Sequence, residues 1–290
     1  MKYVRFGKSS LKVSVIGYGA WALGIKDWPG VDEKEALKTL EDCLACGITF
    51  FDTAPVYGFG RSEERLGAVL SSVRKEVIIG TKCGLRWDER GRVFHNLSRD
   101  SIVQEIEASL ARLKTDYIDL YQIHWPDKKT PLEETMDTLK HLQRQGVIRH
   151  IGVSNFSVDI LKQAVSLGEI ACVQNLYNML QREAEAEILP FCRKNDLGFI
   201  CYSPLAQGIL AGNFNDDFKP GRHDIRRLNP LFRTTKKLQQ SILFARTLPG
   251  DPLLTALGFL VEQQGVSSIL ISMTQRKHLK KNLQAIGVSK

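Results

Sequence analysis

The sequence has no apolar run long enough to cross a membrane, which takes about 20 consecutive apolar residues. Residues 1–5 lack the apolar core of a secretory signal peptide. No low-complexity tract and no linker rich in proline, glycine and serine divides the chain. These absences, with a hydrophobic content of 43%, predict one cytoplasmic globular domain over residues 1–290 and no membrane partner.

Acidic residues are missing from the end of the sequence, since none follows Glu262, and the chain carries 40 basic against 32 acidic residues. One predicted helix, starting near residues 272–274, is crowded with cations: Arg276, Lys277, Lys280 and Lys281. A helix N-terminus with nearby cations suits an anion, but a solvated basic face explains the same pattern, and both interpretations stay open. No recognised nucleic-acid-binding motif accompanies the charge, so no nucleic-acid partner is predicted.

Six cysteines without a secretory signal indicate a reducing cytoplasm rather than a disulfide framework. Cys43 and Cys46 have the spacing of a redox motif, but they lie in a predicted helix over residues 33–46, where positions i and i+3 share a face. We therefore expect two small buried residues on a helix. The sequence predicts no metal site.

Short strand-like apolar runs alternate with segments of helical spacing along the whole chain. The runs cover residues 14–17, 48–51, 77–81, 117–123, 150–153, 171–173, 198–201 and 268–271. Eight such units in 290 residues predict an α/β fold, a (β/α)8 TIM barrel with its active site at the C-terminal mouth. Residues 2–14 predict an N-terminal β-hairpin, and residues from about 213 to 249 a long loop after the seventh strand, either a lid or a mobile surface loop.

Four polar side chains follow three successive predicted strands and should meet at the mouth. Asp52 ends one strand, Tyr57 follows five residues later, and Lys82 and His124 end the next two. Tyrosine, with an ordinary pKa of about 10, exchanges protons poorly at neutral pH, but a neighbouring ammonium lowers that pKa and a carboxylate holds the ammonium. A histidine can polarise a carbonyl oxygen. The set suits proton transfer at a carbonyl or carbinol oxygen, with a hydride carrier supplied separately.

Several further motifs stand in a fixed order along the chain. They are residues 50–54 (FFDTA) with 57–58 (YG), 62–63 (SE), 66–67 (LG), 80–82 (GTK), 112–121 (RLKTDYIDLY), 148–156 (IRHIGVSNF), Gln174 with 177–178 (YN), and 202–205 (YSPL) with 208–210 (GIL). In these motifs, from about residue 5 to 285, the sequence resembles an aldo-keto reductase. The resemblance implies a (β/α)8 barrel that uses NADPH, or possibly NADH, to reduce a small-molecule aldehyde or ketone, or catalyses the reverse reaction.

Carried over position by position, the resemblance makes Tyr57 the general acid, its pKa lowered by Lys82, which Asp52 holds, and it places His124 over the carbonyl oxygen. It implies that the cofactor is bound by Ser154, Asn155 and Gln174 at the nicotinamide carboxamide, Tyr202 against the ring, Ser203, Pro204, Leu205 and Gly208 at the pyrophosphate, and Ser272, Arg276 and Asn282 at the adenosine end. It implies that Trp21 and Trp125 line the substrate pocket, with Trp87 a further candidate.

The sequence departs from the family pattern at two cofactor positions. Lys281 stands where relatives have an acid, and Asn213 where they often have lysine. Relatives also often continue into a C-terminal helix and a loop over the substrate. Two function classes therefore stay open: a catalytic NADP(H)-dependent carbonyl reductase, and a non-catalytic or weakly catalytic NADP(H)-binding redox sensor or regulatory subunit. The sequence does not indicate the oligomeric state.

Overall fold

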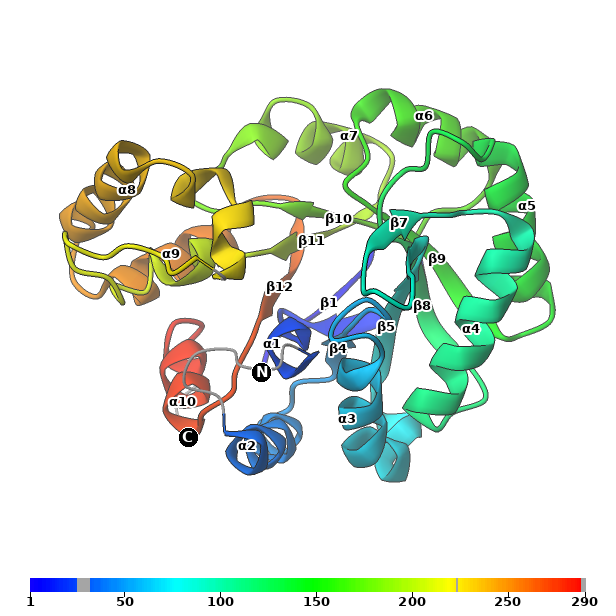
Figure 1. Ribbon diagram of the computed structural model, residues 1–290, viewed down its shortest axis with the longest axis horizontal. Coiled ribbons are helices and arrows are strands. Elements are labelled where there is room, and N and C mark those ends of the chain that lie inside the picture. The colour runs from blue at the N-terminus through cyan, green and yellow to red at the C-terminus, as the bar shows by residue number, and fades with distance from the viewer. Residues whose placement is uncertain (25–31, 223, 288–290) are drawn as a thin grey trace.

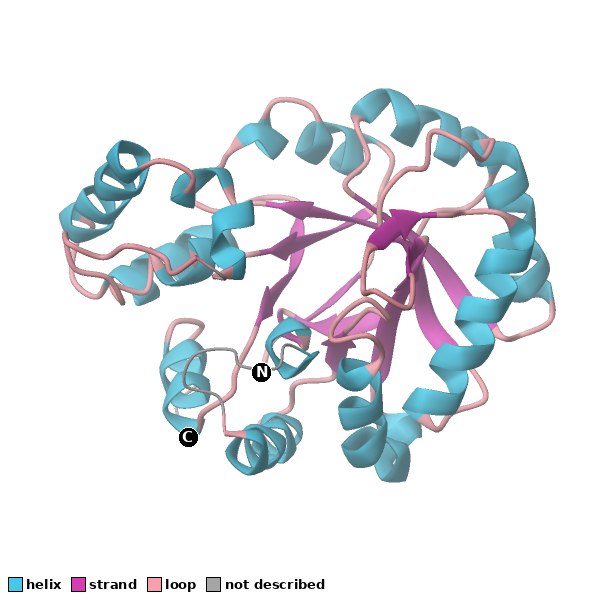
Figure 2. Ribbon diagram, in the orientation of Figure 1, coloured by secondary structure: helices cyan, strands magenta, loops and turns pink. Residues whose placement is uncertain are grey.

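A closed barrel of eight parallel strands forms the centre of the computed structural model, which describes residues 1–24, 32–222 and 224–287 (Figures 1 and 2). The barrel strands are β3 (Ile16–Gly19), β4 (Phe50–Asp52), β5 (Ile78–Cys83), β8 (Ile118–Ile123), β9 (Ile148–Ser154), β10 (Cys172–Leu176), β11 (Gly198–Tyr202) and β12 (Val266–Ile271). They follow one another in chain order, and β12 closes on β3 with Leu270 opposite Gly17. The predicted TIM barrel is confirmed.

Most of the helices surround the barrel and pack an apolar stripe against the strands (Figure 2). They are α1 (Trp21–Gly24), α2 (Glu33–Ala45), α3 (Arg61–Leu70), α4 (Arg99–Leu113), α5 (Leu132–Arg144), α6 (Val158–Leu167), α7 (Ile188–Lys194), α8 (Thr235–Thr247), α9 (Pro252–Glu262) and α10 (Arg276–Gln284). In α5 the stripe is Met136, Leu139 and Leu142, spaced by three and all buried. In α2 the Asp32 carboxylate caps the first turn by accepting from Glu35 N at 2.8 Å.

An N-terminal hairpin covers the N-terminal end of the barrel, as predicted. Its strands, β1 (Tyr3–Arg5) and β2 (Lys12–Ser14), pair antiparallel. The turn between them places the side chain of Phe6 inside the barrel, where its ring packs edge to face on the ring of Phe50, with centroids 5.5 Å apart. The hairpin therefore closes the N-terminal end of the barrel, so a binding site is expected at the opposite, C-terminal end.

A second hairpin, which the sequence interpretation did not include, follows β5. It consists of β6 (Leu85–Trp87) and β7 (Val93–His95). The carboxylate of Asp88 holds its turn by accepting from the backbone N of Arg90 and of Arg92, each at 2.9 Å. Because β5 ends at the mouth, this hairpin brings Trp87 to that end of the barrel.

The segment expected as a long loop, 213–249, is in part helical, so that expectation is wrong there; residue 223 lies outside the described residues. Helix α8 forms because Thr234 caps its N-terminus and Leu238, Ile242 and Ala245 make a buried stripe. Figure 1 shows α8 at the outer edge of the molecule, away from the barrel strands. Nearby, Arg226 is paired with Asp224 at 2.5 Å.

The cysteines and the helices give three further results. All six cysteines are free thiols, with Cys43 buried and Cys46 partly exposed, so the expectation that both are buried holds only for Cys43. No helix in the described part of the chain is long and apolar enough to cross a membrane. Among the same residues, no group of three or more histidine, cysteine or acidic side chains is arranged to hold a metal ion.

Candidate active site

The C-terminal ends of β4, β5 and β8 bring the four predicted catalytic side chains together. Lys82 Nζ donates to Asp52 Oδ1 at 2.5 Å and to the carbonyl of Thr53 at 2.8 Å. The same ammonium lies 3.5 Å from the hydroxyl of Tyr57. The ring of His124 meets that of Tyr57 edge to face, with centroids 5.7 Å apart. The arrangement is a continuous chain from carboxylate to ammonium to phenol, with an imidazole beside the phenol.

Close backbone packing fixes the loop that carries Tyr57. Gly58 has a positive φ of 67° and lies against Gly24, so that a Cβ on Gly58 would come within 1.9 Å of the Gly24 carbonyl oxygen. Only glycine tolerates both conditions. Behind the loop, Ser62 Oγ donates to the carbonyl of Ala20 at 2.8 Å and lies 2.8 Å from Thr53 Oγ1. The phenol is therefore held from two sides before any substrate arrives.

Lys82 is fully buried, and its charge depends on its neighbours. Burial alone would lower the pKa of its ammonium, but the Asp52 carboxylate and the Tyr57 hydroxyl outweigh burial and raise the pKa above its ordinary value. The side chain is therefore a cation throughout the neutral range. Because Nζ donates to both Asp52 and Thr53, that cation is held in one place.

Tyr57 differs from expectation. Burial raises the pKa of its phenol; Lys82 opposes this, Asp52 adds to it, and the pKa ends above its ordinary value. Lys82 lowers the pKa as expected, but burial outweighs Lys82 and Asp52 adds to the effect of burial, so the net pKa does not fall below its ordinary value. At neutral pH the phenol is thus protonated, the form that a proton donor needs.

His124 is neutral at physiological pH. Burial, with smaller contributions from Lys82 and His95, holds the pKa of its imidazole well below the ordinary value. A neutral imidazole carries one N–H, which can donate to a carbonyl oxygen without supplying a charge. The backbone N of His124 donates to the carbonyl of Cys83 at 3.0 Å, which ties β8 to β5 at the mouth.

Two buried glutamines, one of them missed in the sequence, hold the far oxygen of Asp52. Gln122 Nε2 donates to Asp52 Oδ2 at 2.8 Å, and Gln174 Nε2 donates to the same oxygen at 2.9 Å. Gln174 Nε2 also donates to Gln122 Oε1 at 3.1 Å. Gln122 lies two residues before His124 on β8 and points into the barrel, so the period of two along a strand is the signal that could have found it. Gln174, predicted at the nicotinamide, keeps its Oε1 as an acceptor.

The nicotinamide-side residues form one network beside the tetrad. Tyr202 donates from its hydroxyl to Asn155 Oδ1 at 2.8 Å. Asn155 Nδ2 donates to the carbonyl of His124 at 3.0 Å and to Ser154 Oγ at 2.9 Å. Asn155 adopts a positive φ of 61°, which asparagine tolerates better than most residues. The structure thus brings three predicted cofactor residues to His124.

The predicted pyrophosphate loop follows β11 and has an irregular backbone. Ser203, Ala206, Gln207 and Gly208 all have positive φ, between 47° and 103°. Asn178 Nδ2 holds the turn by donating to the carbonyl of Ser203 at 3.0 Å. Such strained loops occur where a backbone must approach a ligand. Pro204 is buried in this loop and Leu205 is partly exposed.

Four buried side-chain oxygens have no hydrogen-bond partner among the described residues: Asp42 Oδ2, which has only its ion pair with Arg276, Tyr121 Oη, Gln207 Oε1 and Asn282 Oδ1. The last two lie among the predicted cofactor residues. A buried acceptor without a donor is costly unless a ligand supplies one. Asn282 is the residue predicted at the adenine, whose amino group is a donor. Gln207 was missed by the sequence interpretation and lies next to Gly208 in the strained loop. These unpaired acceptors fit a nicotinamide dinucleotide lying across the mouth.

At the predicted adenosine end, two of the four cations of α10 form ion pairs. Helix α10 begins at Arg276, later than predicted, and Arg276 Nε lies 2.7 Å from Asp42 Oδ2 on α2. Lys281 is paired with Asp251 at 2.8 Å. Ser272 Oγ donates to the carbonyl of Gly19 at 2.7 Å. The basic helix is therefore a weaker anion site than its sequence indicates.

Aromatic side chains rim the mouth. Trp125, next to His124, is 41% exposed, and Trp21 begins α1 after β3. Trp87 from the second hairpin packs against Phe59, with ring centroids 5.3 Å apart, and Phe59 is half exposed. Phe59 was not among the predicted residues. It follows Tyr57 by two positions, which places it on the same loop as Tyr57.

Comparison with known proteins agrees with this geometry. The sequence profile of the aldo/keto reductase family matches residues 15–289. An aldo-keto reductase of Bacillus subtilis (strain 168) is 40% identical over 80% of this chain and 71% of its own. The NADH-specific methylglyoxal reductase of Escherichia coli (strain K12) is 35% identical over 100% of this chain and 94% of its own. A glycerol dehydrogenase structure from Gluconobacter oxydans has a TM-score of 0.84 and 31% identity over 98% of this chain and 88% of that chain. This chain therefore belongs to the aldo/keto reductase family.

Proposed function

We propose that this chain reduces small aldehydes or ketones to alcohols with a nicotinamide cofactor, and that Tyr57 donates the proton. The observation that carries the proposal is the buried chain from Asp52 to Lys82 to Tyr57, with its contacts of 2.5 and 3.5 Å, beside a neutral His124. A regulatory role without catalysis would not require a protonated phenol and a fixed ammonium at one point of the mouth.

When bound, the nicotinamide supplies the hydride, and the residues of this chain manage the charge that then develops on oxygen. His124 donates its N–H to the substrate carbonyl oxygen and orients it. Tyr57 donates its proton to the same oxygen as negative charge builds there, so the product is a neutral alcohol. The resulting phenolate lies next to Lys82, whose ammonium stabilises it. Asp52 keeps that ammonium charged and in place.

We propose that Ser154, Asn155 and Tyr202 hold the nicotinamide end, that the loop from Ser203 to Gly208 holds the pyrophosphate, and that Asn282 meets the adenine. Both cofactors should bind, with a modest preference for NADPH. Support comes from the exposed cations of α10, tempered by the ion pair between Arg276 and Asp42. A relative at 35% identity is NADH-specific by name, which supports a weak rather than strict preference.

The substrate is expected to be a small carbonyl compound, bound between the aromatic rim and the tetrad, in contact with Trp21 and Trp125. Methylglyoxal is the first compound to assay, because a relative covering 100% of this chain is named for it. Nitrobenzaldehydes and short sugars complete the panel, since they separate a preference for aromatic substrates from one for polar substrates.

Tyr57→Phe tests the proposal. Removing the hydroxyl should lower kcat/KM by roughly three orders of magnitude, as expected for loss of a general acid, while the Kd of the cofactor changes less than about twofold. Tyr3→Phe, which removes an exposed tyrosine hydroxyl at the other end of the barrel, is the matched control and should keep full activity. Substantial turnover by Tyr57→Phe would remove Tyr57 from the chemistry. Cofactor binding without turnover of any carbonyl by the wild type would favour a sensor instead.

A further inference from the structure

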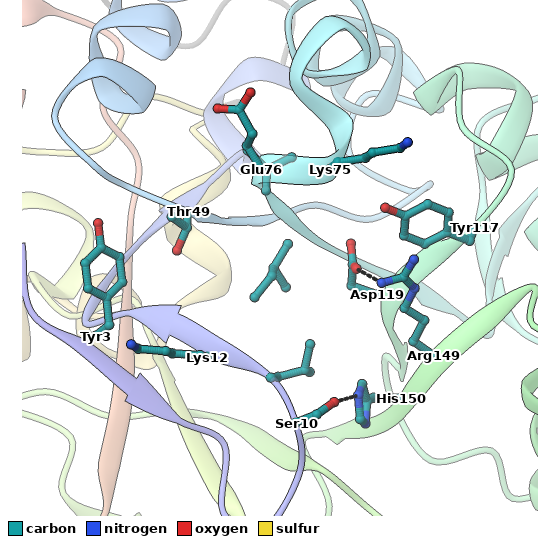
Figure 3. Close-up of a pocket in the computed structure, with 13 residues that line it drawn as sticks. Tyr3, Ser10, Lys12, Thr49, Lys75, Glu76, Tyr117, Asp119, Arg149 and His150 are labelled. Carbon is teal, nitrogen blue, oxygen red and sulfur yellow. Dashed lines mark hydrogen bonds and ion pairs between the residues drawn. The ribbon is translucent and has the colours of Figure 1, made fainter.

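A cavity of about 450 Å³ lies at the end of the barrel opposite the tetrad, between the N-terminal hairpin and the starts of β5, β8 and β9 (Figure 3). We call it the hairpin pocket. Its floor is apolar, with Leu11 of the hairpin and Ile78 of β5, and its rim carries Lys12, Lys75 and Arg149. A volume of this size is in the range of small-molecule sites.

Arg149 is stacked on an aromatic ring at the rim of the hairpin pocket, where its side chain is 55% exposed. The ring of Tyr117 lies between two guanidinium groups, 3.9 Å from Arg74 and 3.8 Å from Arg149. Stacking on an aromatic face fixes the plane of a guanidinium and leaves its N–H edge free. Arg149 is thus oriented in advance, so an anion binding there would lose little side-chain entropy.

The one carboxylate near Arg149 is already satisfied. Asp119 Oδ2 lies 2.6 Å from Arg74 and accepts from Ile79 N at 3.0 Å. Arg149 lies 3.8 Å from Asp119 Oδ1, beyond hydrogen-bond distance. Within the described part of the chain, the guanidinium of Arg149 makes no hydrogen bond, although Arg74 makes four contacts to oxygen. Five donors on a fixed guanidinium are therefore available to a ligand.

The other charges of the hairpin pocket leave it positive. Neither Lys12 nor Lys75 forms an ion pair with any described residue; Lys12 lies 5.9 Å above the ring of Tyr3. Figure 3 shows the Glu76 carboxylate and the Lys75 ammonium both turned away from the middle of the pocket, with Lys75 on the same side of the view as Arg149. Burial lowers the pKa of His150, so that side chain is neutral at physiological pH. The pocket is lined by three cations, Lys12, Lys75 and Arg149, and by two carboxylates, Glu76 and Asp119, so its net charge is positive.

We infer that the hairpin pocket binds a small organic anion with at least two carboxylate or phosphate charges. Arg149 would take one oxyanion group through two parallel hydrogen bonds, and Lys75 or Lys12 would take the second. The carbon skeleton would rest on Leu11 and Ile78. A monovalent ion such as chloride would use one cation only and bind weakly.

Binding should stabilise the barrel, because the walls of the pocket belong to the hairpin and to three different strands. With a ligand at ten times its Kd, the melting temperature should rise by about 3–5 °C. Anion binding in the hairpin pocket does not depend on the proposed reaction, because the pocket and the tetrad lie at opposite ends of the same strands. The test measures anion binding and not enzyme activity.

Isothermal titration calorimetry with citrate and, separately, inorganic phosphate tests the site, on protein saturated with NADPH so that the cofactor's phosphate groove is filled. Binding of citrate alone would identify a polycarboxylate site, and binding of both ligands would identify a general oxyanion site.

Arg149→Gln should weaken binding at least tenfold and Lys75→Gln about threefold. Lys236→Gln, which removes an exposed lysine on α8, should leave it unchanged. Melting temperatures that rise no more with citrate than with sodium chloride of equal ionic strength, or a Kd that Arg149→Gln leaves unchanged, would overturn the proposal.

Discussion

Replacing Lys82 by methionine should separate the stability of the buried ion pair from its role in catalysis. Methionine keeps most of the volume of the lysine stem but removes the ammonium, which leaves the Asp52 carboxylate buried without its cation. Removing one partner of a buried pair usually costs about 3–5 kcal/mol. Here Gln122 and Gln174 still donate to Asp52, so we expect the lower end, about 3 kcal/mol.

The loss should appear as a fall in melting temperature of roughly 6–12 °C, since 1 kcal/mol corresponds to about 2–4 °C in a chain of this size. The double variant Lys82→Met with Asp52→Asn removes both charges and should recover most of the stability. It should recover no activity, because the phenolate of Tyr57 would still lack its counter-charge. Both variants should lose at least about 100-fold in kcat/KM, the worth of a hydrogen bond to a charged group.

Differential scanning calorimetry and steady-state kinetics on the single and double variants decide the matter. Asp52→Asn alone is the control, because it keeps the ammonium and should be milder in activity than Lys82→Met. If the double variant regained activity along with stability, Lys82 would be a structural residue only. A single variant as stable as the wild type would show that the carboxylate is protonated or solvated when the lysine is absent.

Three further changes test the surroundings of the tetrad. Gln122→Leu removes one of two amide donors to Asp52, so it should lower the free energy of unfolding by about 2 kcal/mol and kcat by roughly tenfold. Gln122→Glu places a second carboxylate beside the first and should lower both stability and kcat further. Chemical denaturation and steady-state kinetics measure the two effects. Arg276→Ala should weaken NADPH more than NADH, and Asp42→Asn, which frees the guanidinium, should strengthen NADPH; equal changes for the two cofactors would show that α10 is a solvated surface. Burial raises the pKa of Glu105 to about 7, so between about pH 4.5 and 7 the native state holds a proton that the unfolded state has released. Stability should therefore fall by about 1.4 kcal/mol per pH unit as pH rises through that range. Glu105→Gln should flatten this slope in melting experiments.

The barrel and its tetrad were readable from the sequence because both depend on local patterns repeated in order. Most of the eight apolar runs end in a polar residue, and the ends of parallel strands converge whatever the details of the connecting loops. This rule alone was enough to predict that Asp52, Lys82 and His124 lie together. The second hairpin was missed although its turn has a sequence signal, Asp88 followed by Gly91, because the eightfold count did not require it.

Other features depend on pairs of residues far apart in the sequence. Arg276 and Asp42 are separated by 234 positions, and no local pattern shows that they neutralise each other. The pKa of Tyr57 required the distance to Lys82 and the depth of burial, neither of which residue spacing supplies. Helix α8 was hidden because Lys236 and Lys237 open a segment whose buried stripe is only one side chain wide.

The two ends of the barrel differ in how their charges are satisfied. At the mouth the buried Lys82 ammonium has a carboxylate, a backbone carbonyl and a hydroxyl as partners, and Asp52 has two amide donors besides. Such saturation keeps each group in one protonation state, as a proton donor beside a fixed cation requires. In the hairpin pocket, Arg149 is half exposed, stacks on Tyr117 and has only a loose ion pair with Asp119, 3.8 Å away. Stacking sets the plane of its guanidinium and leaves its donors accessible, which is why we expect an anionic ligand to replace solvent at that end of the molecule.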